Sequence, residues 1–489
     1  MAKRVTVIDI GSNSVRMVIY EKSSRFAFHL LHESKSKVRI SQDAYLNNNN
    51  LQEAPMQRTI DALREFLSIS KSFKSTKILC VATSALRDAP NSDIFLKRVK
   101  QEIKLKIKII SGEKEAYFGA IACANLLKSQ QNALSIDIGG GSTELSIIDG
   151  KNITKTISLE LGTVRLKELF FDKNDIDGAI KYIDSKLSKL NDKSIKTIIG
   201  IGGTMRAVSS AIMIKQQYPL QKLHAYEYDG SIFVDFLSDI LKADNTKLKK
   251  LGIKSDRFDI IKPGALIVLR IIQKISLKSV ITSGVGVREG VYLSDLLRNS
   301  KDKLPHNYNT SVRYLIDAHI KDTTFSNQLN KLAKNIFDIT HKHFGIDTKY
   351  RQDFAIAAKL YPIGNSIHFY SKHKHSYYLV QNALEYGFSH KQIILIATLL
   401  RYAKRKLPSD EHTKKYFELL PEKKTLNTLS YLLSLTIILL SHRPRDIDFD
   451  IEFNNNTLRV KSPKKLYLLR ESLNKLQGVE DFRVKISAP

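Results

Sequence analysis

The sequence predicts an α/β protein whose first half forms two similar lobes with a cleft between them, followed by a helical domain and a small α+β end piece. Three observations predict this: an Asp-Ile-Gly turn occurs twice, strands alternate with helices up to about residue 300, and glycine becomes scarce afterwards. The 489 residues are enough for about three domains. We expect lobes at 1–130 and 131–300, a helical domain at 301–440 and the end piece at 441–489.

The first lobe begins with two short β-branched segments joined by a polar turn. Residues 5–10 and 15–20 have strand composition, and the turn between them predicts a hairpin. The elements expected next are a helix at 56–66, a strand at 77–82, a helix from Ser92, a strand at 106–110 and a helix at 113–127. Residues 134–138 then repeat the opening strand.

The repeat is the most informative pattern. Residues 8–11 match residues 136–139, and Ser14 matches Ser142 at the same offset. Two ordinary hairpins with Gly-rich turns are the alternative, but the shared order and spacing favour two related lobes that present equivalent loops to each other.

The composition of these loops suits a phosphate chain. Glycine lets the backbone approach an anion, and serine hydroxyls add hydrogen-bond donors. The expected phosphate-binding residues are Gly11, Ser12, Asn13, Ser14, Arg16, Gly139, Gly140, Gly141, Ser142 and Thr143. Asp9 and Asp137 end the two strands, where they are suited to hold Mg²⁺ through water, although either could instead satisfy turn N–H groups.

The two copies differ at one informative offset. Arg16 in the first copy corresponds to Glu144 in the second. We therefore expect one loop to grip the substrate and the other to serve water or metal.

Bulk composition limits the classes of function. The formal net charge of +29 reflects either lysine-rich solvated surfaces or an attractive field for a polyanion. Two cysteines in unrelated contexts exclude a disulfide framework and fit a reducing cytoplasm. The longest apolar run, 429–440, contains polar residues and predicts a buried helix rather than a membrane span.

Other nucleotide-binding motifs are missing. The sequence has neither a Gly-x-x-x-x-Gly-Lys-Ser/Thr loop nor a Gly-x-Gly-x-x-Gly turn opening a βαβ unit. Glycine loops at 200–204 and 283–286 follow predicted strands and either are simple turns or line the same cleft.

Six motifs in order resemble the exopolyphosphatase and guanosine pentaphosphate phosphatase (Ppx/GppA) family. They are Asp-Ile-Gly-Ser-Asn-Ser, Thr-Ser-Ala-Leu-Arg, Ser-Gly-x-x-Glu-Ala, Asp-Ile-Gly-Gly-Gly-Ser-Thr-Glu, Gly-Gly-Thr and Ser-Gly-x-x-x-Arg-Glu-Gly, between Asp9 and Gly290. The resemblance implies the two actin-like (ribonuclease H-like) lobes of that family, hydrolysis of terminal phosphoanhydride bonds, a Mg²⁺ cofactor and a homodimer.

The resemblance also implies residue roles. Glu115 matches the catalytic glutamate that orients water, and Arg87 matches an arginine that grips phosphate. Glu144 matches a second glutamate that places water or metal, with Asp9 and Asp137 around Mg²⁺. From the residues alone, Glu115 could be an acid at a helix N-terminus, and Arg87 could be paired on the surface with Asp88.

The helical half resembles an HD-type phosphohydrolase domain more weakly. His368, His373 and His375 suggest a metal site, but Tyr361-Pro362 stands where the His-Asp pair would be. A basic surface that includes His373, His375 and the run 401–406 is the preferred interpretation. The end piece is expected to contain a hairpin (447–453 and 458–461), a helix (464–476) and a strand (482–486), for packing or dimer contact.

The function predicted is release of orthophosphate from polyphosphate, or conversion of pppGpp to ppGpp. The alternatives are an ATP-dependent kinase or ATPase of the same fold, and a non-catalytic sensor of polyphosphate or alarmone. Neither a nucleic acid duplex nor a membrane is expected as a partner.

Overall fold

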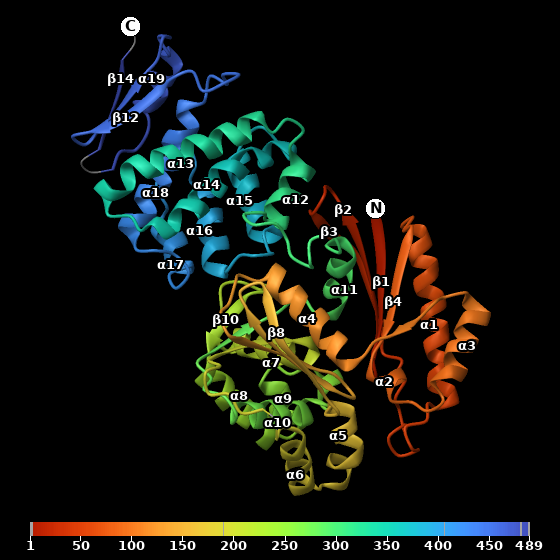
Figure 1. Ribbon diagram of the computed structural model, residues 1–489. Coiled ribbons are helices and arrows are strands. Elements are labelled where there is room, and N and C mark those ends of the chain that lie inside the picture. The colour runs from red at the N-terminus through yellow and green to blue at the C-terminus, as the bar shows by residue number, and fades with distance from the viewer. Residues whose placement is uncertain (1–2, 189, 405, 480–481, 488–489) are drawn as a thin grey trace. The chain divides into compact units, whose positions relative to one another are not determined.

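The computed structural model describes residues 3–188, 190–404, 406–479 and 482–487 (Figure 1). The chain divides into two compact units, 1–308 and 309–489. The first contains two sheets and the second is mainly helical.

The sheet of the first lobe has five strands in the order β3-β2-β1-β4-β5. They are β1 (Arg4–Ile10), β2 (Val15–Lys22), β3 (Phe28–Ser36), β4 (Lys77–Ala82) and β5 (Lys108–Ile109). The first three are antiparallel, and β4 and β5 run parallel to β1. Alternating apolar residues of β1, such as Ile8 and Ile10, are fully buried against α1 (Glu53–Ser72) and α3 (Ser92–Ile103). The sequence-based prediction lacks β3, because this strand has no β-branched residue and its second half, residues 32–36, is polar.

The second lobe repeats this topology. Its strand order is β10-β11-β9-β6-β7-β8, in which β8-β7-β6-β9-β11 corresponds to the first sheet and β10 is added at the edge. The strands are β6 (Ala133–Ile138), β7 (Thr143–Asp149), β8 (Asn152–Leu159), β9 (Thr197–Ile201), β10 (Tyr226–Asp229) and β11 (Ser279–Thr282). Two sheets with the same order and directions confirm the expected pair of actin-like lobes.

The strand register fixes the asymmetry of the repeat. Asp9 lies directly across from Arg16 in the first hairpin, and Asp137 lies across from Glu144 in the second. At the same point of the fold, the aspartate of the first hairpin therefore faces a cation, and the aspartate of the second hairpin faces another acid.

Helices α4 (Gly112–Leu126) and α11 (Val287–Leu296) pack tightly on each other. A Cβ added to Gly290 would lie 1.9 Å from the carbonyl oxygen of Phe118, so only glycine allows this approach. α4 also contacts β7 and β8, whereas α11 contacts β1. The two helices thus connect the lobes. The remaining helices of this unit are α2 (Ser84–Arg87), α5 (Thr163–Leu169), η1 (Phe171–Lys173), α6 (Ile176–Lys186), α7 (Gly202–Lys215), α8 (Gly230–Lys242), α9 (Asn245–Lys250), η2 (Ser255–Arg257) and α10 (Ile261–Ile272).

The second unit is a helical domain with one apolar core. Its helices are α12 (Thr310–His319), α13 (Thr324–Phe344), η3 (Thr348–Tyr350), α14 (Arg351–Leu360), η4 (Tyr361–Ser366), α15 (Lys372–Ala383), α16 (His390–Arg401), α17 (Asp410–Lys415) and α18 (Lys423–Leu439). The apolar run at 429–440 is buried in α18, as predicted. Across the described residues, we find no helix with the length and apolarity to span a membrane.

The end of the chain forms a three-stranded sheet in the order β12-β13-β14. Its elements are β12 (Asp450–Asn454), β13 (Thr457–Lys461), α19 (Tyr467–Leu473) and β14 (Arg483–Ser487). The predicted hairpin, helix and strand are all present. Leu458, Val460 and Phe482 are buried in the same core as the helices, so this piece packs on the helical domain.

Of the residues expected on a basic surface, His373 is buried, whereas Lys374 is exposed and His375 is partly exposed. Burial lowers the pKa of His373 to about 4, so this residue is neutral near pH 7. In the part of the chain that is described, no group of His, Cys, Asp or Glu side chains could hold a metal ion by itself. Arg405, in the basic run 401–406, lies outside the described residues.

We predict that this domain loses stability as the pH falls from about 7 to about 4. His412 is buried beside Thr398, and burial lowers its pKa to about 4 as well. In that range the unfolded chain binds protons that the folded chain does not, so the free energy of unfolding decreases. Calorimetric melting at a series of pH values should show a smaller decrease for His412→Gln. An equal decrease in the variant would contradict this assignment.

Candidate functional site

The two matched turns have the same backbone geometry. The Gly11 N–H donates to the Ser14 carbonyl at 3.2 Å, and the Gly139 N–H donates to the Ser142 carbonyl at 2.9 Å. Each turn therefore closes its hairpin with the same hydrogen bond, directly after the strand that carries the aspartate.

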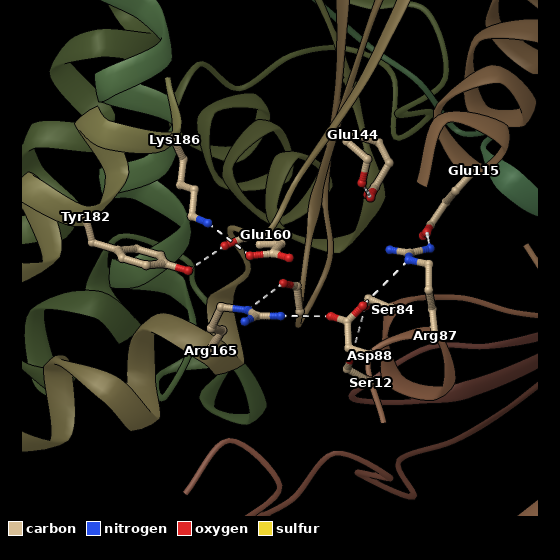
Figure 2. Close-up of polar contacts among 12 residues, drawn as sticks. Ser12, Ser84, Arg87, Asp88, Glu115, Glu144, Glu160, Arg165, Tyr182 and Lys186 are labelled. Atoms are coloured by element: carbon tan, nitrogen blue, oxygen red, sulfur yellow. Dashed lines mark hydrogen bonds and ion pairs between the residues drawn. The ribbon is translucent and has the colours of Figure 1, made fainter. Parts of the chain in front are cut away.

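The two turns pack on each other at the junction of the lobes. A Cβ added to Gly140 would lie 2.9 Å from Ser12 Cβ, and one added to Gly141 would lie 2.8 Å from Ser84 Oγ. Ser12 and Ser84 share a hydrogen bond at 3.2 Å (Figure 2). Glycine is needed at both positions because a side chain would separate the lobes.

A cavity of about 170 cubic ångströms lies beside these turns and is lined by both lobes. The predicted site residues that line it are Asp9, Gly11, Ser12, Asn13, Ser14, Arg16, Glu115, Asp137, Gly139, Gly140, Ser142 and Glu144. The structure thus gathers most of the predicted site around one space.

Four buried or partly buried acids face this cavity: Asp9, Glu115, Asp137 and Glu144. Burial raises the pKa of Asp137 to about 6 and that of Glu144 to about 8. Burial, and then the neighbouring Glu144, raise the pKa of Glu115 well above its ordinary value. Burial also raises the pKa of Asp9, although Arg288 and Arg16 oppose the shift. These carboxylates need a cation or a proton in the cavity.

Five cationic side chains line the same cavity: Arg16, Lys35, Arg206, Arg257 and Arg288. Arg288 Nη1 is 2.6 Å from Glu33 Oε1, and Arg206 Nε donates to the Ser283 carbonyl at 2.8 Å. A Cβ on Gly203 would meet the Arg257 guanidinium at 2.8 Å. These contacts hold the cations along the cavity wall, where they favour a multivalent anion.

The start of helix α7 adds a further anion-binding feature. Gly202, Gly203 and Thr204 line the cavity, so the positive end of the helix dipole faces it. Gly202 has a φ of +79°, and a Cβ there would lie 2.2 Å from Asp137 Oδ1. The turn can therefore lie against the aspartate only with glycine at this position.

Glu115 and Arg87 form a contact at the edge of the cavity. Arg87 Nη1 donates to Glu115 Oε2 at 3.2 Å and to the Ile110 carbonyl at 3.1 Å. Asp88 Oδ1 is 3.7 Å from Arg87 Nε, but its closer partner is Arg165 of the second lobe, at 2.8 Å. Figure 2 shows this chain of charges across the junction. Arg87 thus bonds the proposed catalytic carboxylate and does not itself line the cavity.

Two further predicted residues lie outside the cavity lining. Gly141 is packed against Ser84 and Ser12, and Thr143 is fully buried with its hydroxyl donating to the Leu161 carbonyl. Both residues support the turn from behind.

Several lining residues were missed from the sequence. Arg206 lies two residues after the 200–204 glycine loop, and Arg288 belongs to the Ser-Gly-x-x-x-Arg-Glu-Gly motif, so a sequence motif marked both positions. Lys35 lies on the unpredicted β3, paired with Arg16 across the strands. Arg257 lies in a short 3₁₀ helix and had no signal.

The donor set fits Mg²⁺ in its usual form. No three carboxylate, histidine or cysteine groups among the described residues make a complete ligand set. Mg²⁺, however, typically takes one or two carboxylates and keeps several waters, with phosphate oxygens from the substrate. Such an ion would stabilise the ionised form of these buried carboxylates, which burial disfavours.

Comparison with protein-family models identifies the class. The model described as the Ppx/GppA phosphatase family matches residues 18–299, and that for Ppx/GppA phosphatase domain III matches residues 309–477. The chain belongs to the Ppx/GppA phosphatase family. It is therefore a member of a family of hydrolases, as its motifs predicted.

Relatives of known name agree with this assignment. The chain is 26% identical over 476 residues to a guanosine-5'-triphosphate,3'-diphosphate pyrophosphatase of Photobacterium profundum, covering 93% of this chain and 91% of that protein. It is 33% identical over 283 residues to a bifunctional 3-dehydroquinate synthase/phosphatase of Fusobacterium nucleatum, covering 54% of this chain and 42% of that protein. The chain thus spans less than half the length of the second relative.

Solved structures share the fold of the first unit. The Aquifex aeolicus member of the family is 28% identical, with a TM-score of 0.53 over 61% of this chain and 99% of that one. An exopolyphosphatase from Cytophaga hutchinsonii is 22% identical, with a TM-score of 0.56 over 62% of this chain and all of that one, which shows the fold alone.

We predict that Gly202→Ala lowers phosphatase activity by at least about tenfold, because the methyl group displaces Asp137. It should also lower the free energy of unfolding by about 1 kcal/mol or more, since φ is positive there. Gly345→Ala is the matched control: its φ is +64°, but no atom lies within 4 Å. The control should lose similar stability and keep full activity. Phosphate release and thermal melting measure both effects, and full activity in Gly202→Ala would contradict the prediction.

Proposed function

We propose that this chain removes the terminal phosphate from a phosphoanhydride-linked chain, with inorganic polyphosphate and pppGpp as the candidate substrates. The observation that supports this most directly is the convergence of two glycine turns, four acids and five cations on one cavity. Hydrolysis of a phosphoanhydride requires positioning, neutralisation of charge and an in-line water.

In this mechanism the two turns bind the phosphate chain. Gly11 to Ser14 and Gly139 to Ser142 approach it from opposite lobes, while Arg16, Arg206 and Arg288 neutralise its oxygens. Arginine suits this role because its planar fork matches two phosphate oxygens at once.

Glu115 orients the attacking water and accepts its proton as the bond to phosphorus forms. The raised pKa of Glu115 strengthens it as a proton acceptor, while the Arg87 contact favours its ionised form. Arg87 is therefore a positioning residue in this proposal.

Asp9, Asp137 and Glu144 are the side chains that would hold Mg²⁺, in part through water. The ion would neutralise charge that develops on the phosphate oxygens. Glu144 is further oriented by Ser158, whose hydroxyl donates to its carboxylate at 2.9 Å.

Within this proposal we favour polyphosphate. Of the described residues that line the cavity, none is aromatic, so no ring is available to stack on a guanine base. Burial lowers the pKa of Lys35, and the nearby charges of Arg16, Arg257 and Lys37 lower it further. Lys35, on β3, and Arg257, in η2, thus extend the positive wall of the cavity beyond the two turns. The Photobacterium relative, named for a guanosine substrate, supports pppGpp as the second candidate.

The proposal includes a cytoplasmic location and a homodimer. Light scattering of the purified chain measures its oligomeric state independently of its activity.

We predict that the wild-type chain with Mg²⁺ releases phosphate from polyphosphate or pppGpp faster than from ATP. Glu115→Gln should lower kcat by at least about a hundredfold, because the water loses its acceptor. Glu113→Gln, an exposed acid in the first turn of the same helix, should have no effect. Hydrolysis of ATP alone would support an ATPase instead, and polyphosphate binding without turnover would support a sensor.

A separate prediction concerns the cations along β3. Lys35→Gln should lower kcat/KM for polyphosphate about three- to tenfold and weaken its dependence on salt, because one phosphate contact is lost. The effect on pppGpp should be smaller. Lys181→Gln, on the exposed face of α6, changes the same charge outside the cavity and should leave both unchanged. Equal effects on the two substrates would contradict an extended cationic track.

A further inference from the structure

The helical unit contains a cavity of about 230 cubic ångströms that is lined entirely by residues of that unit. It lies among the starts of α13, η4 and α15 and the ends of α16 and α18. It is independent of the cavity in the first unit and of the function proposed for it.

Three cationic side chains, Lys372, Lys404 and Arg443, line this cavity without any acid among its described lining residues. Some cations of this unit are paired, such as Arg351, which lies 2.6 Å from Asp338. None of the three lining cations has a salt bridge to a described residue within 4.0 Å. Three like charges around one space repel one another, and a bound anion would remove that cost.

Aromatic rings hold two of these cations in place. The Arg443 guanidinium lies 3.3 Å from the centre of the Phe325 ring, and Lys372 Nζ lies 5.4 Å from that of Tyr361. Arg443 also adopts a φ of +52°, a conformation that glycine or asparagine would adopt more easily. The backbone therefore does not explain an arginine at this position, whereas its place at the cavity does.

Hydroxyl groups complete the polar wall. Tyr361, Ser434 and Ser441 line the cavity, and burial raises the pKa of Tyr361 to about 12, so it remains a hydrogen-bond donor at neutral pH. Tyr361 and Pro362 occupy the sequence position of the His-Asp pair that a metal site would need. Donors and cations in place of metal ligands favour an anion over a metal ion.

We propose that this pocket binds a small phosphate-class anion with at least two charges, such as a diphosphate group. Arginine and lysine with hydroxyl donors match phosphate oxygens, and three cations match a multivalent anion. The apolar side of the cavity, which includes Ile437 and Ile438, limits the ligand to a compact group and leaves no groove for a nucleic acid duplex.

The absence of tryptophan from the sequence allows a specific test. Phe325→Trp places the chain's single tryptophan in the wall of this pocket, and its emission, excited at wavelengths that tyrosine does not absorb, does not directly report anion binding in the other unit. The full-length variant is titrated with methylenediphosphonate, a diphosphate analogue that resists hydrolysis, without Mg²⁺ and at constant ionic strength. We expect a saturable change in emission.

Lys404→Gln and Lys372→Gln, each added to the reporter variant, should weaken binding about tenfold. Lys374→Gln removes the same charge from an exposed position on α15 and should not change the affinity. The proposal would be overturned if sodium chloride, added to the same ionic strength, produced the same change in emission as methylenediphosphonate. An unchanged affinity in both pocket variants would overturn it as well.

If Phe325→Trp fails to fold by circular dichroism, Ser441→Trp supplies a second reporter at the exposed rim of the pocket. A short polyphosphate titrated in the same way distinguishes the sources of the phosphate group. Tighter binding of the polyphosphate identifies the end of a chain as ligand, and tighter binding of methylenediphosphonate identifies a free diphosphate.

Discussion

Gly140 in the turn of one hairpin lies against Ser12 in the turn of the other: a Cβ on Gly140 would lie 2.9 Å from Ser12 Cβ and 3.2 Å from Val164 Cγ2. The position of every group in the cleft depends on this contact. Each aspartate sits at the end of the strand that leads into its turn, so the distance between the turns also sets the distance between Asp9 and Asp137. Larger residues would move the two acids and the two backbone cradles apart together. The contact explains why the repeat keeps glycine and serine in the turns while the residues that face the cavity differ.

The cleft gathers opposite charges without pairing them completely. The acids are buried, and their pKa values rise because water no longer stabilises the ionised form. The cations line the same cavity. Repulsion among the acids and among the cations is relieved when a ligand supplies both positive and negative charge. In the proposed function, a phosphate chain with a divalent cation would do so: its oxygens would lie against the arginines, and the cation would lie against the carboxylates. The unliganded cleft is therefore electrostatically prepared for such a pair.

Sequence reasoning was most successful where a residue's role follows from the backbone. The turns, the paired sheets and the contrast between Arg16 and Glu144 all follow from strand register, which a repeat makes visible. It missed Lys35, because β3 has no β-branched residue and its second half is polar. It also missed Arg257, which reaches the cavity only through tertiary packing against Gly203. It could not foresee the burial of His373, since the spacing of histidines does not indicate which helix covers them.

The cross-strand pairs also show how the two lobes differ in charge at equivalent positions. In the first hairpin Asp9 faces Arg16, which opposes the rise in the pKa of Asp9 that burial causes. In the second, Asp137 faces Glu144, and the charge of Asp137 adds to the rise in the pKa of Glu144 that burial causes. The first hairpin thus pairs an acid with a cation, whereas the second pairs two acids, so an added cation or proton relieves more repulsion at the second. Burial, and then Glu144, raise the pKa of Glu115, and Arg87 of the first lobe opposes this rise. Glu115 therefore interacts with charges of both lobes, which supports the proposal that it holds the attacking water.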